Sequence, residues 1–165
     1  MHSSMTLFKL YMLPYGRVVR REVALARIEG EDVVLNVGCG SLPFTAVLVA
    51  RLTGAKVVAI DIDPEAVEAA RRVVSMLGMD ESIEVLHADG LGPIPRRYTK
   101  ALVALHVSPK DVAVRNLISG GPAVVLRMPR GSLSVSYGAD AMRLDPKEHI
   151  SHLMPTFDRS LLFEA

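Results

Sequence analysis

The segment VVLNVGCGSLPF, residues 33–44, decides the fold of this chain. It starts as a short apolar run rich in branched residues, which is typical of a buried strand. The run ends at Gly38, Cys39 and Gly40. Glycine lets the backbone turn tightly and lets another molecule approach the main chain closely. We therefore expect a strand followed by a turn that faces an open edge of a sheet.

Two further segments carry acidic residues at the ends of apolar runs. VVAIDIDPEAVEAARRV, residues 57–73, reaches Asp61, and IEVLHADG, residues 83–90, reaches Asp89. In parallel sheets the strand ends lie at one edge, where a carboxylate accepts hydrogen bonds from ribose hydroxyls. A glycine turn and two carboxylates at three strand ends predict a nucleoside pocket at this edge.

The pattern distinguishes between two classes of nucleoside ligand. The spacing resembles the S-adenosylmethionine site of class I methyltransferase-fold enzymes. Dinucleotide-binding domains use a related G-x-G-x-x-G fingerprint, whose third glycine allows close helix packing around a pyrophosphate. Pro43 stands where that glycine would fall, and Asp89 has no counterpart in the dinucleotide fingerprint. The residues favour S-adenosylmethionine over NAD, and a tight turn without a ligand is the remaining alternative.

Each predicted strand end is expected to contact a different part of this cofactor. The glycine turn would contact the methionine part, the second strand end would hold the ribose beside the adenine, and the third would accept from the adenine amino group. Asp89 as a simple loop residue is the alternative for the third position. The expected cofactor-binding residues on these strand ends are Gly38, Cys39, Gly40, Leu42, Asp61, Ile62, Ala88 and Asp89.

Strand and helix signals alternate along the chain, which favours a mostly parallel, doubly wound α/β sheet. The resemblance of the strand-end motifs implies that this sheet is of the Rossmann-like class I methyltransferase type. Asp63-Pro64 is a strong helix start, and the glycines at 54, 78 and 120–121 are expected to end helices in the left-handed conformation. The tail, residues 151–165, is expected to add one or two antiparallel strands. Strands are expected at 32–37, 56–61, 83–88, 100–106 and 122–128, and helices at 15–28, 43–53, 64–77 and 109–119.

Length and composition predict one domain over residues 1–165, with residues 1–14 as an N-terminal extension. No apolar run is long enough to span a bilayer, and no signal peptide is expected. The single cysteine, Cys39, fits a cytoplasmic protein. The net charge of +1 makes nucleic acid an unlikely partner. The absence of Gln and the presence of only two Asn residues hint at a thermophilic source.

Two positions bear on the chemistry of the pocket. Asn36 stands where most methyltransferases of this fold carry an acidic residue, so the methionine ammonium would be held differently. His106 ends the fourth predicted strand and is a candidate acid or base, with a hydrogen-bonded surface histidine as the alternative. The histidines show no metal-binding spacing with Cys39, so no metal site is expected.

A closer resemblance rests on GCGSLPFTAVLVA, residues 38–50. It is similar to the G-x-G-x-L-P-L-T segment of nicotianamine synthases and their archaeal relatives, and this resemblance implies an archaeal source. Tyr15 and Glu22 fall at the spacing of a Y-x₆-E pattern in those proteins, and RMPRGSLSVSY at 127–137 is similar to their R-x₃-G-x₄-L-Y segment. The resemblance covers roughly residues 11–138.

The resemblance implies an unusual use of S-adenosylmethionine. In nicotianamine synthases an amine attacks the γ-carbon of the methionine chain, which transfers a 3-amino-3-carboxypropyl group and releases methylthioadenosine. Tyr15 is then expected near a small-molecule amine acceptor, and Arg127 at the cofactor carboxylate or, alternatively, on the surface after the fifth strand.

One feature of the family is expected to be missing. Nicotianamine synthases carry a helical N-terminal domain that covers the acceptor pocket and supplies a catalytic Glu. Glu22 is the candidate substitute in this chain. A homodimer formed through the apolar segment around Leu7, Leu10 and Met12 is the candidate cover.

Three functions stay open at this point. Aminocarboxypropyl transfer is favoured by Asn36 and by the segment at 42–45. Methyl transfer to a small molecule or RNA is the common activity of this fold. A non-catalytic S-adenosylmethionine-binding subunit is the third alternative.

Overall fold

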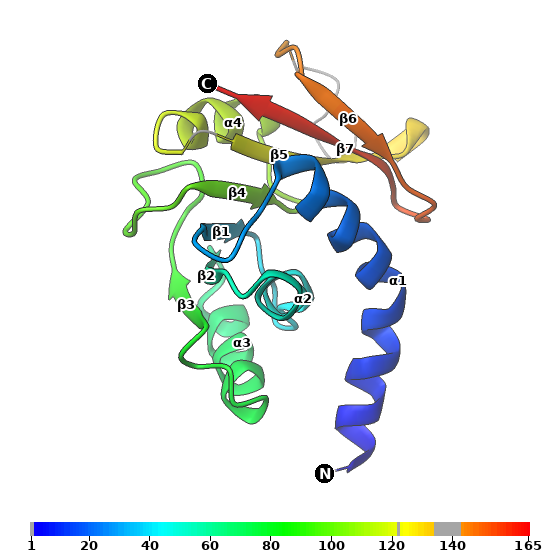
Figure 1. Cartoon of the computed structure of the whole chain (residues 1–165), viewed down its shortest axis with the longest axis vertical. Helices are drawn as coiled ribbons and strands as arrows, with labels where there is room; N and C mark the ends of the chain where they lie inside the picture. Colours follow the sequence, from blue (N-terminus) through cyan, green and yellow to red (C-terminus); the bar gives the residue numbers. More distant parts are fainter. Residues whose placement is uncertain (1, 122, 134–142) are drawn as a thin grey trace.

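A seven-stranded sheet forms the centre of the protein (Figure 1). The computed structural model describes residues 2–121, 123–133 and 143–165. The strand order is β3-β2-β1-β4-β5-β7-β6; β1 to β5 run parallel, and β7 pairs antiparallel with both β5 and β6. This arrangement confirms the predicted class I methyltransferase fold. The strands are β1 Val33–Val37, β2 Lys56–Asp61, β3 Ile83–His87, β4 Lys100–Val103, β5 Ala123–Pro129, β6 Glu148–Ser151 and β7 Phe157–Glu164.

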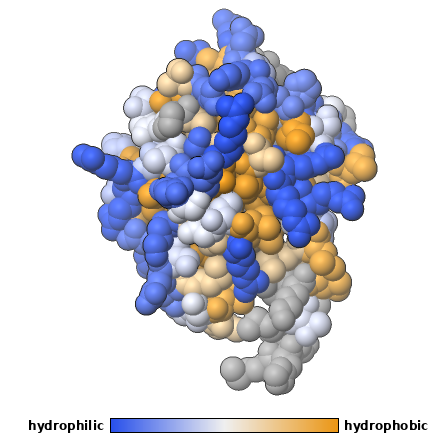
Figure 2. Space-filling view, in the orientation of Figure 1, coloured by the Kyte–Doolittle hydropathy of each residue, from blue (hydrophilic) through white to orange (hydrophobic). Residues whose placement is uncertain are grey.

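Helices cover both faces of the sheet, and each face has its own apolar core. The helices are α1 His2–Ala26, α2 Phe44–Thr53, α3 Pro64–Met76 and α4 Lys110–Ile118, with a 3₁₀ turn at Gly131–Leu133. Helices α1, α2 and α3 pack with one set of strand residues, which includes Val34 and Val57. Helix α4 packs with Leu35 and other residues of the opposite face. In Figure 2 hydrophilic side chains cover much of the visible surface, with apolar patches between them.

The strand register brings the predicted site residues to one edge. Val37 lies level with Ile60 of β2 and with Val103 of β4, and Asp61 lies level with His87. Because the chain leaves each of these parallel strands at the carboxyl edge of the sheet, the residues that end the strands lie close together there. The alternation of strands and helices therefore places the glycine turn and both carboxylates on the same rim.

Helix α1 differs most from the prediction, because it starts far before residue 15. It begins at His2 and continues through Pro14, so residues 2–14 belong to the helix and form no separate extension. Figure 1 shows its N-terminal half projecting beyond the sheet. Among the residues expected at a dimer contact, Leu10 is 61% exposed, whereas Met12 is only 8% exposed and packs in the core. Met12 was therefore wrongly expected at the surface, and the Leu7 side chain lies outside the described residues.

Two of the three predicted helix ends have the expected backbone. Gly54 and Gly78 adopt positive φ angles of 77° and 65°. Gly120 and Gly121 do not, and they have a different role. A Cβ on Gly120 would lie 2.7 Å from the Tyr98 hydroxyl, and one on Gly121 would lie 2.6 Å from the same ring. The glycine pair makes room for Tyr98, whose hydroxyl donates to the Leu117 carbonyl at 2.6 Å.

No helix among the described residues is long and apolar enough to cross a membrane.

Candidate functional site

Two cavities meet at the carboxyl edge of the sheet. The first has a volume of about 230 Å³ and the second about 170 Å³. Gly38 and His106 line both, so the two cavities adjoin. The first is lined by Tyr15, Gly38, Cys39, Gly40, Leu42, Phe44, Thr45, Ala104, Leu105, His106, Arg127, Thr156 and Phe157. The second is lined by Val37, Gly38, Asp61, Ile62, Ala88, Asp89, Gly90, Leu91, His106, Val107 and Ser108.

The predicted cofactor residues divide between these cavities. The residues of the glycine turn and Arg127 line the first cavity, and the residues at the ends of β2 and β3 line the second, together with Gly38. Among the predicted catalytic residues, Tyr15 and His106 line the first cavity. Glu22 lines neither cavity, because it is buried behind Arg127 at 1% exposure. Eleven of the twelve predicted residues thus line the two cavities, and Glu22 lies behind one of them, Arg127.

The glycine turn is fixed by hydrogen bonds to β2. The amides of Gly38 and Cys39 donate to the Ile60 carbonyl at 2.9 and 3.0 Å. The Gly40 amide donates to Asp61 Oδ2 at 2.8 Å, and the Asp63 amide donates to Asp61 Oδ1 at 3.0 Å. Each Asp61 oxygen has lone pairs beyond these bonds. Asp61 therefore shapes the turn and still has acceptor capacity toward the second cavity.

Gly38 is in direct contact with the loop that follows β4. Its φ angle is 75°, and an added Cβ would lie 2.9 Å from Val107 Cγ2 and 3.0 Å from His106 Nε2. Both the conformation and the contact require glycine. The turn and the β4–α4 loop are thus packed together at the place where the two cavities meet.

The loop after β3 is held by a residue that the sequence analysis did not single out. The Asn116 amide on α4 donates to the carbonyls of Gly90 and Gly92 at 2.9 and 2.8 Å. Asp89 Oδ1 accepts from the Leu91 amide at 2.9 Å. The rarity of Asn in the chain was the only signal in the sequence that pointed to Asn116. These bonds fix Asp89 at the mouth of the second cavity, where Ile62 is exposed.

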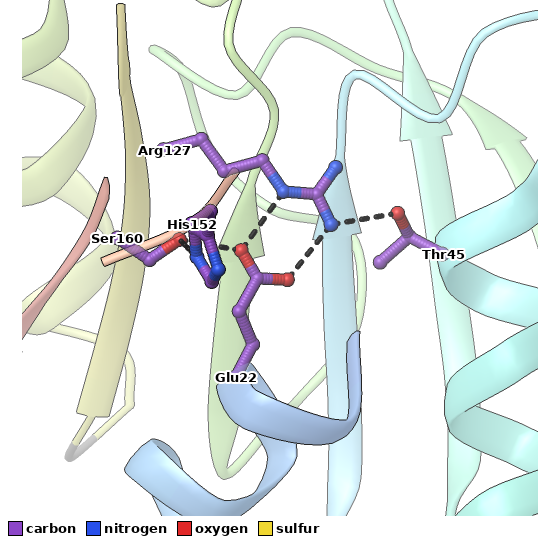
Figure 3. A network of polar contacts seen from close by, with 5 residues as sticks. All are labelled: Glu22, Thr45, Arg127, His152 and Ser160. Carbon is purple, nitrogen blue, oxygen red and sulfur yellow. Dashed lines mark hydrogen bonds and ion pairs between the residues drawn. The ribbon is translucent and has the colours of Figure 1, made fainter. Parts of the chain in front are cut away.

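A buried ion pair lies behind the first cavity (Figure 3). Arg127 Nε donates to Glu22 Oε1 at 2.9 Å, and Nη2 donates to Oε2 at 2.7 Å and to Thr45 Oγ1 at 3.1 Å. Burial opposes ionisation of Glu22, but Arg127 holds the Glu22 pKa below its ordinary value. The pKa of Arg127 is raised because the charge and hydrogen bonds of Glu22 outweigh the effect of burial. Both groups are therefore charged, and the guanidinium is fixed in a bidentate geometry.

Two more buried residues join this pair on the side away from the cavity. Ser160 Oγ on β7 donates to Glu22 Oε1 at 2.7 Å, and His152 Nε2 lies 2.9 Å from Ser160 Oγ. Neither residue was predicted as part of the site. Nothing in the local sequence pattern marks them, because they join Glu22 only when the tail is placed beside β5.

Aromatic and sulfur groups form part of the wall of the first cavity. The rings of Tyr15 and Phe44 stack with centroids 5.8 Å apart. The Cys39 thiol is buried, and burial raises its pKa to about 12, so it is a neutral wall group at pH 7. His106 is exposed at the rim.

No group of three possible metal ligands is found among the residues that the structure describes.

A buried lysine supports the loop that borders both cavities. Lys110 is 0% exposed, and Nζ donates to the carbonyls of Leu105 and Val107 at 2.5 and 3.1 Å. No ion pair to Lys110 occurs among the described residues. Burial lowers its pKa from 10.5 to about 8. The ammonium thus anchors the loop while lacking a neutralising charge.

We expect the free energy of unfolding to rise as the pH increases from about 8 toward 10.5. In this range the unfolded chain still holds the lysine proton, whereas the folded protein has lost it, so the unfolded state binds more protons. Chemical denaturation on either side of pH 8 measures the effect. Lys110→Met is the control, because it should remove this contribution. Equal pH dependence in the variant and the wild type would contradict the assignment.

Comparison with known proteins agrees with this geometry. The methyltransferase domain family matches residues 34–117, about half of the chain. L-histidine 2-aminobutanoyltransferase from Yersinia pestis is 29% identical over 129 residues, which is 76% of this chain and 48% of the relative. Ribosomal protein L11 methyltransferase from Aliivibrio fischeri is 32% identical over 124 residues, 72% of this chain and 37% of the relative.

Among solved structures, the E81Q mutant of MtNAS, a nicotianamine synthase, superposes with a TM-score of 0.81 at 23% identity. The match covers 97% of this chain and 64% of that protein. The same mutant has been solved in complex with S-adenosylmethionine. This likeness concerns the fold.

The chain belongs to the methyltransferase domain family and has the class I S-adenosylmethionine-dependent methyltransferase fold, with nicotianamine synthase-like neighbours. It spans about half the length of the curated relatives it matches. Both curated relatives named above are bacterial, so the expectation of an archaeal, thermophilic source finds no support in them.

Proposed function

We propose that the chain binds S-adenosylmethionine across the two cavities and transfers its 3-amino-3-carboxypropyl group to a small-molecule amine. The observation that carries this proposal is Arg127, a buried and rigidly held cation at the end of the first cavity. Methionine has a carboxylate at the end of its chain, and a fixed guanidinium is a good partner for a carboxylate. The named relative from Yersinia pestis, an aminobutanoyltransferase, supports this type of transfer.

The residues present fit the cofactor in charge and in shape. Asp61 and Asp89 offer acceptors to the ribose and adenine in the second cavity, and Gly38 lets the main chain approach the sulfur end. Asn36 lines neither cavity, although the next residue, Val37, lines the second. The buried Oδ1 atom of Asn36 has no hydrogen-bond partner among the described residues, so it is an unused acceptor behind the site and not a direct contact of the ammonium group.

One guanidinium nitrogen of Arg127 is available for the carboxylate. The Nε and Nη2 atoms are engaged by Glu22 and Thr45, whereas the third nitrogen has no hydrogen bond to a described residue and points away from Glu22 in Figure 3. We infer that this nitrogen and the fixed plane of the guanidinium orient the methionine chain. A point charge on a flexible side chain would provide less orientation.

The bound cofactor supplies an electrophilic carbon next to a sulfonium. The protein must place the amine in line with that carbon and keep water away. Tyr15, stacked on Phe44, is proposed to hold the acceptor amine, and His106 at the rim is proposed to take up the proton that the amine loses. Glu22 is not proposed as that base, because its carboxylate is buried and fully engaged by Arg127 and Ser160.

Methyl transfer is the second candidate function. It is favoured by the similarity to ribosomal protein L11 methyltransferase over 72% of the chain. The two reactions differ in the nucleoside released, which is methylthioadenosine for aminocarboxypropyl transfer and S-adenosylhomocysteine for methyl transfer. Chromatography of the nucleoside formed from labelled cofactor in a metabolite extract distinguishes them. We expect methylthioadenosine; S-adenosylhomocysteine would assign methyl transfer, and cofactor binding without either product would favour a non-catalytic subunit.

Asp61→Ala is expected to weaken S-adenosylmethionine binding by about 1–3 kcal/mol, because polar partners are left unpaired. Calorimetric titration measures the change. Asp63→Ala is the matched control. Asp63 Oδ1 caps α3 by accepting from the Glu65 amide at 2.9 Å, so its loss should cost about 1 kcal/mol of stability and leave binding unchanged. Tighter binding of NAD than of S-adenosylmethionine by the wild type would refute the proposed cofactor.

A further inference from the structure

His152 is a buried histidine whose place the proposed reaction does not explain. It follows β6 directly, and its amide donates to the Asp158 carbonyl at 2.6 Å. Its ring packs edge-on against Phe157 at 5.7 Å, and the Arg127 guanidinium lies 5.5 Å from the centre of the same Phe157 ring. His152 thus lies in the same packed layer as Arg127.

The direction of the hydrogen bonds shows that Nε2 of this histidine carries a proton. The Glu22 carboxylate only accepts, so the single hydroxyl proton of Ser160 is donated to it. Ser160 Oγ must then accept at its other contact, which means that His152 Nε2 carries the proton. Nδ1 has no partner among the described residues, and a proton there would be buried without an acceptor, which favours the bare form of Nδ1. Burial lowers the pKa of His152, which agrees with a neutral ring.

All the donors of this network converge on one carboxylate. His152 donates to Ser160, Ser160 donates to Glu22 Oε1, and Arg127 donates to both Glu22 oxygens. Figure 3 shows Ser160 and His152 on one side of the carboxylate and the guanidinium on the other. Since a bidentate pair requires coplanar groups, whatever fixes the plane of the carboxylate also fixes the plane of the guanidinium.

We propose that His152 is a positioning residue which, through Ser160 and Glu22, holds Arg127 in the orientation that binds the methionine carboxylate of the cofactor. The inference rests on the proposed function, because it assumes that Arg127 meets this carboxylate. His152 touches neither cavity at the sheet edge. Replacement of His152 should therefore weaken the binding of a ligand that carries the carboxylate and leave the binding of a ligand without it unchanged.

Two nucleosides separate this role from a purely structural one. S-adenosylmethionine carries the carboxylate, whereas methylthioadenosine keeps the adenosine and lacks the carboxylate. His152→Leu is expected to weaken S-adenosylmethionine binding about tenfold and to leave methylthioadenosine binding unchanged. Ser160→Ala should act in the same direction. His152→Gln places an amide nitrogen close to the position of Nε2 and is expected to restore most of the selectivity.

Matched variants and a direct spectroscopic readout complete the test. His149→Leu removes an exposed histidine of β6 and should leave both affinities unchanged. Nitrogen-15 spectra of the wild type should show the Nε2-protonated tautomer of His152. Equal losses for both nucleosides in His152→Leu, no loss for either, or a Gln variant that behaves like the Leu variant would overturn the proposal. Failure of the wild type to bind either nucleoside would instead overturn the proposed function.

Discussion

Replacing Glu22 by alanine should lower the free energy of unfolding by about 3–5 kcal/mol, because it leaves the charge of Arg127 buried without a partner. The Arg127 side chain is 9% exposed and the Glu22 side chain 1% exposed, so water can solvate the unpaired charge only weakly. Urea denaturation measures the loss. The control is Glu148→Ala, which removes an exposed pair with Arg27 at 3.8 Å and should cost less than about 1 kcal/mol. A similar small loss at Glu22 would contradict the description of the pair.

A double substitution of Glu22 and Arg127 separates the effect of the pair on stability from its effect on cofactor binding. Glu22→Leu combined with Arg127→Met replaces both charges by apolar groups, and such replacements are often neutral or stabilising. We expect this double variant to recover most of the stability lost in Glu22→Ala. It should nevertheless lose the preference for S-adenosylmethionine over methylthioadenosine, because the carboxylate partner is gone. Retention of that preference would show that Arg127 does not bind the methionine end.

Gly38→Ala is expected to abolish measurable cofactor binding and to lower the free energy of unfolding by about 2–4 kcal/mol. Two costs combine at this position: the left-handed backbone at φ 75°, and a Cβ placed 2.9 Å from Val107 and 3.0 Å from His106. The loop between the cavities must shift to accept the new atom. Calorimetric titration and denaturation measure the two effects.

Gly54→Ala is the matched control for this change. Gly54 also has a left-handed backbone, at φ 77°, but a Cβ there would meet nothing within 4 Å, and the residue ends α2 away from the cavities. It should cost about 1–2 kcal/mol of stability without affecting cofactor binding. Normal binding by Gly38→Ala would refute the role of the turn in the site.

The sheet was largely predictable because its signals are local. The runs that end at Val37 and Asp61 are mostly apolar, with Asn36 as the one polar residue inside them, as buried parallel strands require, and their ends necessarily lie on one rim. The cap at Asp63 likewise depends on neighbouring residues alone. The glycines at 120–121 show where local signals fail, because their positions are dictated by Tyr98, a residue from another loop.

The role of Glu22 was not predictable for the same reason. Its spacing from Tyr15 suggested a catalytic carboxylate, yet its partners Arg127 and Ser160 lie on strands from the far end of the chain. A helical pattern gives the face on which Glu22 lies but not what packs against that face. His152 was undetectable in the sequence because its contact with Ser160 depends on the antiparallel pairing of β6 with β7.

The position of β7 between β5 and β6 has a consequence for the order of folding. Glu22 is separated by 105 residues from Arg127 and by 138 residues from Ser160. We expect contacts so distant along the chain to form late, because the entropy of closing a long loop is lost before the contacts can stabilise the fold. A nascent chain that has not yet added β7 carries the Glu22 carboxylate without its hydroxyl partner. The network around Glu22 is therefore complete only after β7 has been synthesised and has joined the sheet.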